Sequence, residues 1–341
     1  MQVKVAALIV TYGERNAYLN QVVAGLREQG DRLSELVVVF NGNAIQAEAF
    51  SASNEHFRVH KVVLPSNQGS AAGFKAALSY AWKHSSAEYF WLLDDDNQPQ
   101  LGSLEHLLRG LELLGGSEDV LMLSLRRNRR EFLHTACCGA PVRIRPNSFH
   151  GFHFKSLVTQ PRLPGRSHRQ DPLTADQFRF IIAQVEYAPY GGLLLHRDWL
   201  RRVGYPNEDY VLYADDHEFT TRIVKEGGRI YLCPLSEIHD LENSFHWKNE
   251  GLGGHLLSSD DDPLRLYYGT RNRVHMELNG FVTSRVTYFC NILTCLLLLF
   301  CWQLLTERCP LPLVKRLALV IEAIKDGWTN RLGFNAKYVL P

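Results

Sequence analysis

Short apolar runs alternate with amphipathic stretches over the first 125 residues. Apolar runs of strand length occupy residues 3–11, 36–40, 57–64, 89–93 and 119–125. Between them, residues 14–29, 70–84 and 101–114 carry apolar side chains at helical spacing, as at Leu19, Val22, Val23 and Leu26. Strands that alternate with helices at this spacing predict βαβ units, and hence a mostly parallel sheet covered by helices on both faces.

The alternation is lost over residues 127–180. Prolines interrupt a basic stretch there, at Pro141, Pro146, Pro161, Pro164 and Pro172, and we expect an insertion or a mobile loop. Regular structure returns near Val185, with a helix predicted over 215–225 and a strand over 229–233. From about residue 262 the spacing is helical to near the end. The pattern therefore predicts an α/β domain over residues 1–245 and a helical C-terminal region over residues 246–341.

One helical segment, residues 288–305, is strongly apolar and is interrupted only by Asn291, Thr294 and Gln303. Its length reaches the lower limit for a membrane span, ~18 residues. Its uninterrupted part, residues 295–302, is too short to span, which favours a buried or membrane-surface helix. Together with the apolar segment 311–324, it suggests peripheral membrane docking or self-association as a homo-oligomer.

Composition narrows the class of protein. A chain of 341 residues allows one large or two modest domains. The formal net charge of +1 argues against a polycation built to bind nucleic acid. Seven cysteines without a CxxC motif favour reduced core thiols over a disulfide or zinc framework. Met1 leads directly into a strand without a signal-peptide pattern, so we expect a cytoplasmic protein, peripheral on the inner face of a membrane.

Charge is nevertheless uneven along the chain. Residues 126–170 hold ten arginines and lysines against one acid, Glu131. This basic stretch fits a loop near an anionic acceptor or an anionic membrane surface, and a solvated basic loop explains it equally well.

Three consecutive aspartates, Asp94-Asp95-Asp96, end the apolar run 89–93. Adjacent carboxylates repel one another, so a fold keeps them at a strand end only with a counter-charge or in full contact with water. A divalent cation with oxygen ligands, Mg²⁺ or Mn²⁺, is the usual counter-charge and is often shared with a substrate phosphate. The alternative from this segment alone is a solvated acidic turn.

Other polar residues fall at the ends of the neighbouring strands. Thr11, Asn41 and Asn67 follow three apolar runs as Asp94 follows the fourth. In parallel sheets ligands bind beyond the carboxyl ends of the strands, so these residues should line one crevice. The segment Asn67-Gln68-Gly69-Ser70 opens a helix with small residues, which suits either a phosphate or a plain helix cap.

Three further features are candidates for the same crevice. Asp215-Asp216 begins the helix 215–225; Asp215 can cap that helix, and Asp216 can then serve as a general base. His239, just after the strand 229–233, becomes a metal ligand only if the fold brings it to the aspartate triplet. Gly191-Gly192 is either a wall of the binding site or a simple turn.

These motifs, in this order, resemble family 2 glycosyltransferases with the GT-A fold. The resemblance covers roughly residues 3–245 and rests on the following features: Val10-Thr11-Tyr12, Asn41, Asn67-x-Gly69-x-x-x-Gly73, Asp94-Asp95-Asp96, Gly191-Gly192 and Asp215-Asp216. Within the family, Asp215-Asp216-His217-Glu218-Phe219 resembles bacterial galactofuranosyltransferases, although Ala214 stands where those enzymes have a tryptophan. The segments 267–273 and 324–333 resemble segments shared with rhamnosyltransferases.

The resemblance implies a role for each position. Thr11, Tyr12 and Asn41 would hold the nucleotide, and Asn67, Gly69, Gly191 and Gly192 would line the donor site. Asp94 would contact the nucleoside, Asp95 would share in placing donor or metal, and Asp96 with His239 would bind Mg²⁺ or Mn²⁺. Asp216 would be the general base beside Asp215.

The implied reaction is an inverting, metal-dependent transfer of galactofuranose from its UDP derivative, as in polysaccharide or O-antigen assembly. The acceptor would be a hydroxyl of a glycan or lipid-linked glycan. The alternatives are transfer of rhamnose from a dTDP donor and a non-catalytic module that binds glycan or membrane. Glycoside hydrolysis also uses two carboxylates but does not explain the nucleotide-type strand ends.

Overall fold

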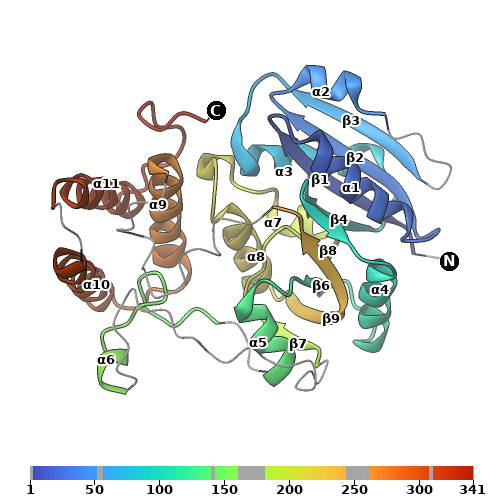
Figure 1. Cartoon of the computed structure of the whole chain (residues 1–341). Helices are drawn as coiled ribbons and strands as arrows, with labels where there is room; N and C mark the ends of the chain where they lie inside the picture. The colour runs from blue at the N-terminus through green and yellow to red at the C-terminus, as the bar shows by residue number, and fades with distance from the viewer. Residues whose placement is uncertain are drawn as a thin grey trace.

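The computed structural model describes residues 3–51, 57–139, 143–159, 181–242, 256, 262–306 and 310–340. Cys309 and most of the proline-rich stretch, residues 160–180, lie outside these ranges. Figure 1 shows an α/β unit at one side of the molecule and three long helices at the other.

A mixed, mostly parallel sheet forms the centre of the α/β unit (Figure 1). The four strands β3, β2, β1 and β4 lie in that order and run parallel: Arg58–Leu64, Leu33–Asn41, Val5–Tyr12 and Tyr89–Asp94. The strand β8 (Leu193–His196) then runs antiparallel between β4 and β6 (Val120–Leu125). This arrangement confirms the α/β fold class predicted from the alternation of strands and helices.

The far edge of the sheet depends on one long strand, β9 (Arg229–Asp240). Its first half pairs in parallel with β6 and antiparallel with β7 (Ala183–Val185). Its last three residues pair with the short strand β5 (Asn97–Pro99), which directly follows the aspartate triplet. The sequence predicted only the first half of β9, so it missed the strand pairing that carries the chain back to the triplet.

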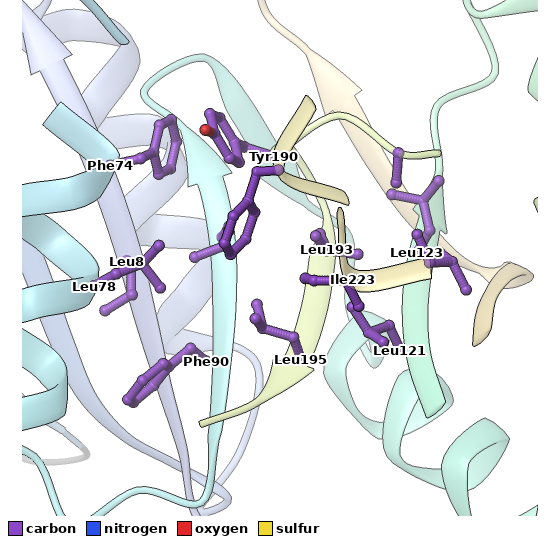
Figure 2. Packing of buried hydrophobic residues seen from close by; sticks show 14 of the residues in the cluster. Leu8, Phe74, Leu78, Phe90, Leu121, Leu123, Tyr190, Leu193, Leu195 and Ile223 are labelled. Carbon is purple, nitrogen blue, oxygen red and sulfur yellow. The ribbon is translucent and has the colours of Figure 1, made fainter. Parts of the chain in front are cut away.

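Both faces of the sheet are buried, because successive residues of a strand point to opposite sides. On one face of β1, Ala6 and Leu8 lie in the core under the helices α3 (Gly69–His84) and α8 (Asp215–Lys225). On the other face, Ala7 and Ile9 lie in the core under α1 (Asn16–Arg27) and α4 (Ser103–Leu113). Figure 2 shows the first of these cores, where Phe74 and Leu78 of α3 lie beside the strand residues Leu8 and Phe90. The continuous apolar runs of the sequence follow from burial on both faces.

The described part of residues 127–180, predicted as an insertion or a mobile loop, contains helices and buried aromatic residues. Residues Arg130–Cys138 form α5, and Phe132 and Ala136 of this helix are buried in the core beside the sheet. Phe149 and Phe152 are fully buried among the C-terminal helices, next to the short helix α6 (Ser156–Thr159). These aromatic side chains explain why a proline-interrupted, basic segment still packs: its apolar residues have partners far away in the sequence.

Short elements complete the α/β unit: α2 (Ala44–Ala49), α7 (Trp199–Val203) and a 3-10 turn, η2 (Glu208–Tyr210). The three long helices are α9 (Pro263–Gly280), α10 (Arg285–Thr306) and α11 (Pro310–Trp328). The helix α9 starts at a proline and is capped by Asp262, whose side chain accepts a hydrogen bond from the Leu264 amide at 3.1 Å. A methyl group at Gly327 of α11 would lie 2.3 Å from the Arg271 carbonyl oxygen, so glycine allows α11 to approach α9 closely.

The cysteines of the described chain are free thiols, as the absence of a CxxC motif predicted. Cys137, Cys233 and Cys295 are buried. Cys138, Cys290 and Cys301 are exposed, which corrects the expectation that all of the thiols lie in the core.

Candidate active site

Three strand ends meet at the carboxyl edge of the sheet, as predicted from their positions along the chain. Val10 lies opposite Asp94 in the pairing of β1 with β4, and Tyr12 lies opposite Asn41 in the pairing of β1 with β2. The tip of β9 reaches the same edge, because Asn97 of β5 lies opposite Asp240.

Asp94, Asp96 and Asp240 form an acidic cluster at this edge. Asn97 holds two of them together: its Nδ2 donates to Asp96 Oδ1 at 3.1 Å and to Asp240 Oδ1 at 3.0 Å. The Asp94 side chain remains 42% exposed, whereas the Asp240 side chain is fully buried. Arg126 Nη1 lies 3.3 Å from Asp240 Oδ1 and 3.9 Å from Asp94 Oδ2, so this guanidinium offsets part of the negative charge.

The carboxyl groups of this cluster have raised pKa values. Desolvation is the largest cause that raises the pKa of Asp94 to about 6 and that of Asp96 to about 7, and the charges of neighbouring aspartates contribute to both shifts. A divalent cation would offset the repulsion between these carboxylates. The residues present therefore fit Mg²⁺ or Mn²⁺, with Asp94, whose side chain is 42% exposed, and Asp96, 13% exposed, as candidate oxygen ligands.

Asp95 has a different environment from its two neighbours. It is buried, accepts a hydrogen bond from Thr11 Oγ1 at 2.7 Å, and receives both carboxylate contacts from Arg15 Nε at 2.9 Å. Asp95 thus binds both Thr11 and Arg15, and these bonds link the ends of β1 and β4. Because Thr11 and Asp95 are engaged in these hydrogen bonds, their predicted contact with the donor would be indirect.

His239 is not beside the acidic cluster. Gln98 and His239 lie opposite each other in the pairing of β5 with β9, one residue away from the pair Asn97 and Asp240. Successive strand residues point to opposite faces, so Asp240 faces the cluster and the exposed side chain of His239 faces away. The structure therefore places the carboxylate of Asp240 at the acidic cluster, instead of the expected imidazole of His239.

Asn41, Asn67 and Gly69 build the loop before α3. Asn41 Nδ2 donates to the Gly69 carbonyl oxygen and its Oδ1 accepts from the Gln68 amide, both at 2.9 Å, while Asn67 Oδ1 accepts from the Gly69 amide at 3.1 Å. Gly69 has φ +85°, and a methyl group there would lie 1.9 Å from the Val211 carbonyl oxygen. The side chain of Asn41 is buried, so it shapes the loop. Tyr12 is the exposed side chain at this end of the crevice, at 39%.

Gly191 and Gly192 lie directly against the acidic cluster. A methyl group at Gly191 would lie 2.0 Å from Asn97 Oδ1 and 2.9 Å from Asp94 Oδ2. At Gly192, with φ +93°, it would lie 2.9 Å from Ser124 Cβ. The pair therefore forms a wall of the site. Because Gly191 has no side chain, Asn97 and Asp94 have room beside it.

Asp215 and Asp216 have different environments although they are adjacent. Asp215 is buried and accepts from Ser70 Oγ, with 3.0 Å to each of its carboxylate oxygens, and burial raises its pKa well above the ordinary value. The Asp216 side chain is 23% exposed, accepts from the His217 amide at 2.7 Å, and has a pKa raised by desolvation to about 6. The predicted helix cap is wrong in detail, since α8 starts at Asp215 and Ala214 is its N-cap.

Asp216 lies close enough to the acidic cluster for its charge to contribute to the raised pKa of Asp94. The neighbouring His217 packs edge-on against Tyr187, with ring centroids 4.5 Å apart. Burial, together with the positive charges of Arg273, Arg129 and Arg126, lowers the pKa of His217 to about 3. This imidazole is therefore neutral at physiological pH and does not compete for the proton that Asp216 would accept.

The segment before Asp216 is held in an unusual backbone conformation by α9. Val211, Tyr213 and Ala214 all have positive φ, at 64°, 66° and 59°. Asn272 Nδ2 of α9 reaches three carbonyl oxygens of this segment, those of Tyr210 at 2.7 Å, Leu212 at 2.8 Å and Tyr213 at 2.9 Å.

Arg271, the residue before Asn272, adds a donor to the same loop. Its Nη2 donates to the Asp209 carbonyl oxygen at 3.0 Å, and its Nη1 donates to the Gly333 carbonyl oxygen. The sequence had marked the segment 267–273 only by its resemblance to other transferases. The contacts of Arg271 and Asn272 show what this segment does in the fold, because they fix the loop that carries the candidate base.

Comparison with known proteins agrees with this arrangement. The family model described as "Glycosyl transferase family 2" matches residues 6–132. A low-salt glycan biosynthesis hexosyltransferase of Haloferax volcanii is 24% identical over 209 residues, which cover 61% of this chain. The match spans 59% of the length of that relative.

Two solved structures share the fold. The mannosyltransferase PcManGT from Pyrobaculum calidifontis, in complex with GDP-Man and Mn²⁺, superposes with a TM-score of 0.53 at 14% identity, covering 97% of this chain and 88% of that one. GalNAc-T7 with UDP, GalNAc and Mn²⁺ superposes with a TM-score of 0.51 at 12% identity, covering 81% of this chain and 47% of that one. Residues 6–132 thus match the glycosyltransferase family 2 domain, the relative is a hexosyltransferase, and the chain shares the fold of two glycosyltransferases of known structure.

Proposed function

We propose that this protein transfers a hexosyl group from a nucleoside diphosphate sugar to a hydroxyl group of a glycan acceptor, with inversion at the anomeric carbon. The observation that carries the proposal is the proximity of Asp94, Asp96 and Asp216 at the carboxyl edge of a nucleotide-binding type of sheet: the charge of Asp216 contributes to the raised pKa of Asp94, and Arg126 acts on the pKa of both. Asp94 and Asp96 can thus hold a metal beside a diphosphate while Asp216 accepts a proton.

Asp216 is the proposed general base. A sugar hydroxyl is a poor nucleophile until its proton is removed, and a carboxylate with a pKa of about 6 is ionised at pH 7 yet basic enough to accept that proton in the transition state. Attack from the face opposite the leaving group inverts the anomeric carbon in one displacement. No covalent sugar–enzyme intermediate is needed.

Asp94 and Asp96 are the proposed ligands of Mg²⁺ or Mn²⁺, and Asp240 orients Asp96 through Asn97. The metal would supply charge neutralisation for the departing nucleoside diphosphate. Arg126, 3.9 Å from Asp94, is placed to add a second positive charge beside the same group. Tyr12, exposed at the end of β1, offers an aromatic face to the nucleotide base.

The proposed donor is UDP-galactofuranose, with a dTDP-linked rhamnose as the alternative. The support is the resemblance of residues 215–219 to galactofuranosyltransferases and of residues 267–273 to both groups of enzymes. A relative that is named a hexosyltransferase of glycan biosynthesis supports a glycan acceptor. Release of UDP or of dTDP from a panel of donors, with and without a chelator, would separate these alternatives from each other and from a module without activity.

Replacement of the base gives the most direct test. Asp216→Asn should lower kcat by at least about a thousandfold, because the amide cannot accept the proton, while UDP affinity changes little. Asp209→Asn is the matched control: its side chain is exposed at the turn η2, and it should leave kcat unchanged. Full transfer by the Asp216→Asn enzyme would overturn the assignment.

A further inference from the structure

The helix α10 has two apolar faces, and only one of them is covered by the protein. Tyr288, Ile292, Cys295 and Leu299 point inward and are at most 5% exposed. They pack against Phe149 and Phe152 of the α5–α6 region and against Leu313 and Val320 of α11. This face belongs to an ordinary protein core.

The opposite face consists of large apolar side chains in contact with water. Its members recur every three to seven residues, so they lie along one stripe of the helix: Val286 is 75% exposed, Phe289 56%, Leu293 50%, Leu297 54% and Leu304 46%. The exposed Cys290 and Cys301 lie on the same stripe. No charged side chain interrupts α10 after Arg285. Such a continuous apolar stripe marks a surface that is covered in the working state of the molecule.

Three hydrogen bonds fix α10 as a helix that lies on the protein. Tyr288 Oη donates to the buried Glu277 of α9 at 2.8 Å. Asn291 Nδ2 donates to the Asn147 carbonyl oxygen, and its Oδ1 accepts from the Phe154 amide, both at 2.7 Å. The segment 285–305 is long and apolar enough to cross a membrane, but these hydrogen bonds tie its inner face to α9 and to residues 147–154. Only the outer stripe is available to a further partner.

The surroundings of the stripe are basic and aromatic. Trp328 of α11 stacks on Tyr288 and meets the exposed Phe289 edge-on, with ring centroids 6.4 Å apart. Lys325, one turn before Trp328, is exposed, as are Lys315 of α11 and Arg285 at the start of α10. The exposed Lys155 lies next to Phe154, which Asn291 contacts.

The acids of α11 are engaged elsewhere. Glu322 pairs with Lys337 at 2.7 Å, and Asp326 accepts a hydrogen bond from Tyr267. The exposed charged residues of the described parts of α10 and α11, namely Arg285, Lys315 and Lys325, are all positive. An uncharged apolar stripe with tryptophan and lysine at its border matches the chemistry of an anionic lipid surface, which combines an apolar interior with negative headgroups.

We propose that the outer stripe of α10, with Trp328, Lys315 and Lys325 of α11, docks the protein on the surface of an anionic phospholipid bilayer. The helix lies in the plane of the interface, with its inner face still packed on the protein. The inference does not depend on the proposed reaction.

Vesicle flotation of the full-length protein tests this docking. We expect binding to vesicles of phosphatidylcholine mixed with phosphatidylglycerol, and weaker binding to phosphatidylcholine alone. Leu293→Ser/Leu297→Ser should weaken partitioning on the order of 10- to 100-fold, because two half-exposed leucines no longer enter the lipid. The matched control is Leu101→Ser/Leu113→Ser, two leucines that are 76% and 71% exposed near α4, on the side of the molecule away from α10 (Figure 1).

A second pair of variants separates charge from apolar contact. Lys315→Glu/Lys325→Glu should reduce binding to the anionic vesicles only, and Lys83→Glu, an exposed charge at the end of α3, should not. Equal vesicle binding by the wild type and the leucine double variant would overturn the proposal. So would a concentration-dependent dimer in buffer that this variant dissociates, since the stripe would then be covered by a second copy. Association that resists alkaline extraction would indicate a span instead.

Discussion

At the residue scale, three adjacent aspartates have two different roles. The Asp94 side chain is 42% exposed and that of Asp96 13%, whereas Asp95 is buried and bonded to Thr11 and Arg15. The same division recurs at the helix α8, where Asp215 is held by Ser70 and Asp216 is exposed to the cleft. In both places a carboxylate that is neutralised inside the protein stands next to one that is available for chemistry.

The raised pKa of Asp216 predicts how the rate depends on pH. The base acts only as the carboxylate, so the rate should fall as the pH falls through its pKa of about 6. With donor, metal and acceptor saturating, we expect kcat to drop roughly tenfold between pH 7 and pH 5. Saturation is required because Asp96, with a pKa of about 7, also loses metal affinity as it protonates. A kcat that stays constant over this range would contradict the role of Asp216.

The pair Arg15 and Asp95 predicts an effect on stability. Arg15→Ala leaves a buried carboxylate with Thr11 as a partner but without its positive charge, and should lower the free energy of unfolding by about 2–4 kcal/mol in urea titrations. Arg27→Ala, an exposed arginine on the same helix region, should cost less than about 0.5 kcal/mol. Adding Asp95→Asn to Arg15→Ala should restore part of the loss, and no restoration would argue against the buried charge as its cause.

At the scale of elements, α9 joins the C-terminal helices to the catalytic loop. One amide side chain, that of Asn272, satisfies three carbonyl oxygens of a loop whose residues have positive φ. The sequence could not show this contact. Asn272 lies about 60 residues from the carbonyl groups it binds, and its neighbours in the chain give only a helical pattern.

Asn272→Asp tests this role with an almost identical shape. The carboxylate cannot donate and would face three carbonyl oxygens, so the loop should shift and kcat should fall on the order of a hundredfold. UDP affinity should change much less, because the nucleotide end of the cleft lies on β1 and β2. Asn279→Asp is the control on the same helix, at an exposed site where the amide Nδ2 contacts the carbonyl oxygen and Nε2 of His275. Equal losses in both variants would indicate a general effect on the helix.

At the scale of the whole molecule, each of the two edges of the sheet carries a group of side chains that could bind a metal ion. Asp94, Asp96 and Asp240 lie at the carboxyl edge. Glu118, His196 and Asp198 lie at the opposite edge, with ligand atoms within 4.8 Å of one another. Of these two groups, the first lies near the candidate base and at the same sheet edge as Tyr12 and Asn41, so it is the one expected to bind metal together with a nucleotide.

Thermal unfolding with ligands distinguishes the two groups. Mn²⁺ and UDP together should stabilise the protein by about 2.7 kcal/mol at a hundredfold excess over Kd, and a chelator should remove the effect. Asp96→Asn should abolish this gain, whereas Asp198→Asn should retain it. If Asp198→Asn abolished the gain and Asp96→Asn retained it, metal and nucleotide would bind at the edge that carries Asp198. This result would contradict the proposed reaction.

The sequence by itself determined the sheet and the position of the cleft. Apolar runs buried on both faces are a local property of each strand, and the polar residue that follows each run necessarily lies at the carboxyl edge. Thr11, Asn41 and Asp94 could therefore be placed together from the order of residues alone. The different environments of Asp215 and Asp216 also followed in outline, because adjacent residues at a helix start cannot share one position.

Only the tertiary structure decided which groups complete the site. Strand pairing between β5 and β9 selects Asp240 over His239, and a shift of one residue in that register would reverse the choice. Arg15, Arg126 and Asn272 enter through contacts across long stretches of chain, which no local pattern encodes. Phe149 and Phe152, which belong to the segment predicted as an insertion or a mobile loop, are buried in the core beneath α10. The sequence did not show this, because burial depends on partners that only the folded chain supplies.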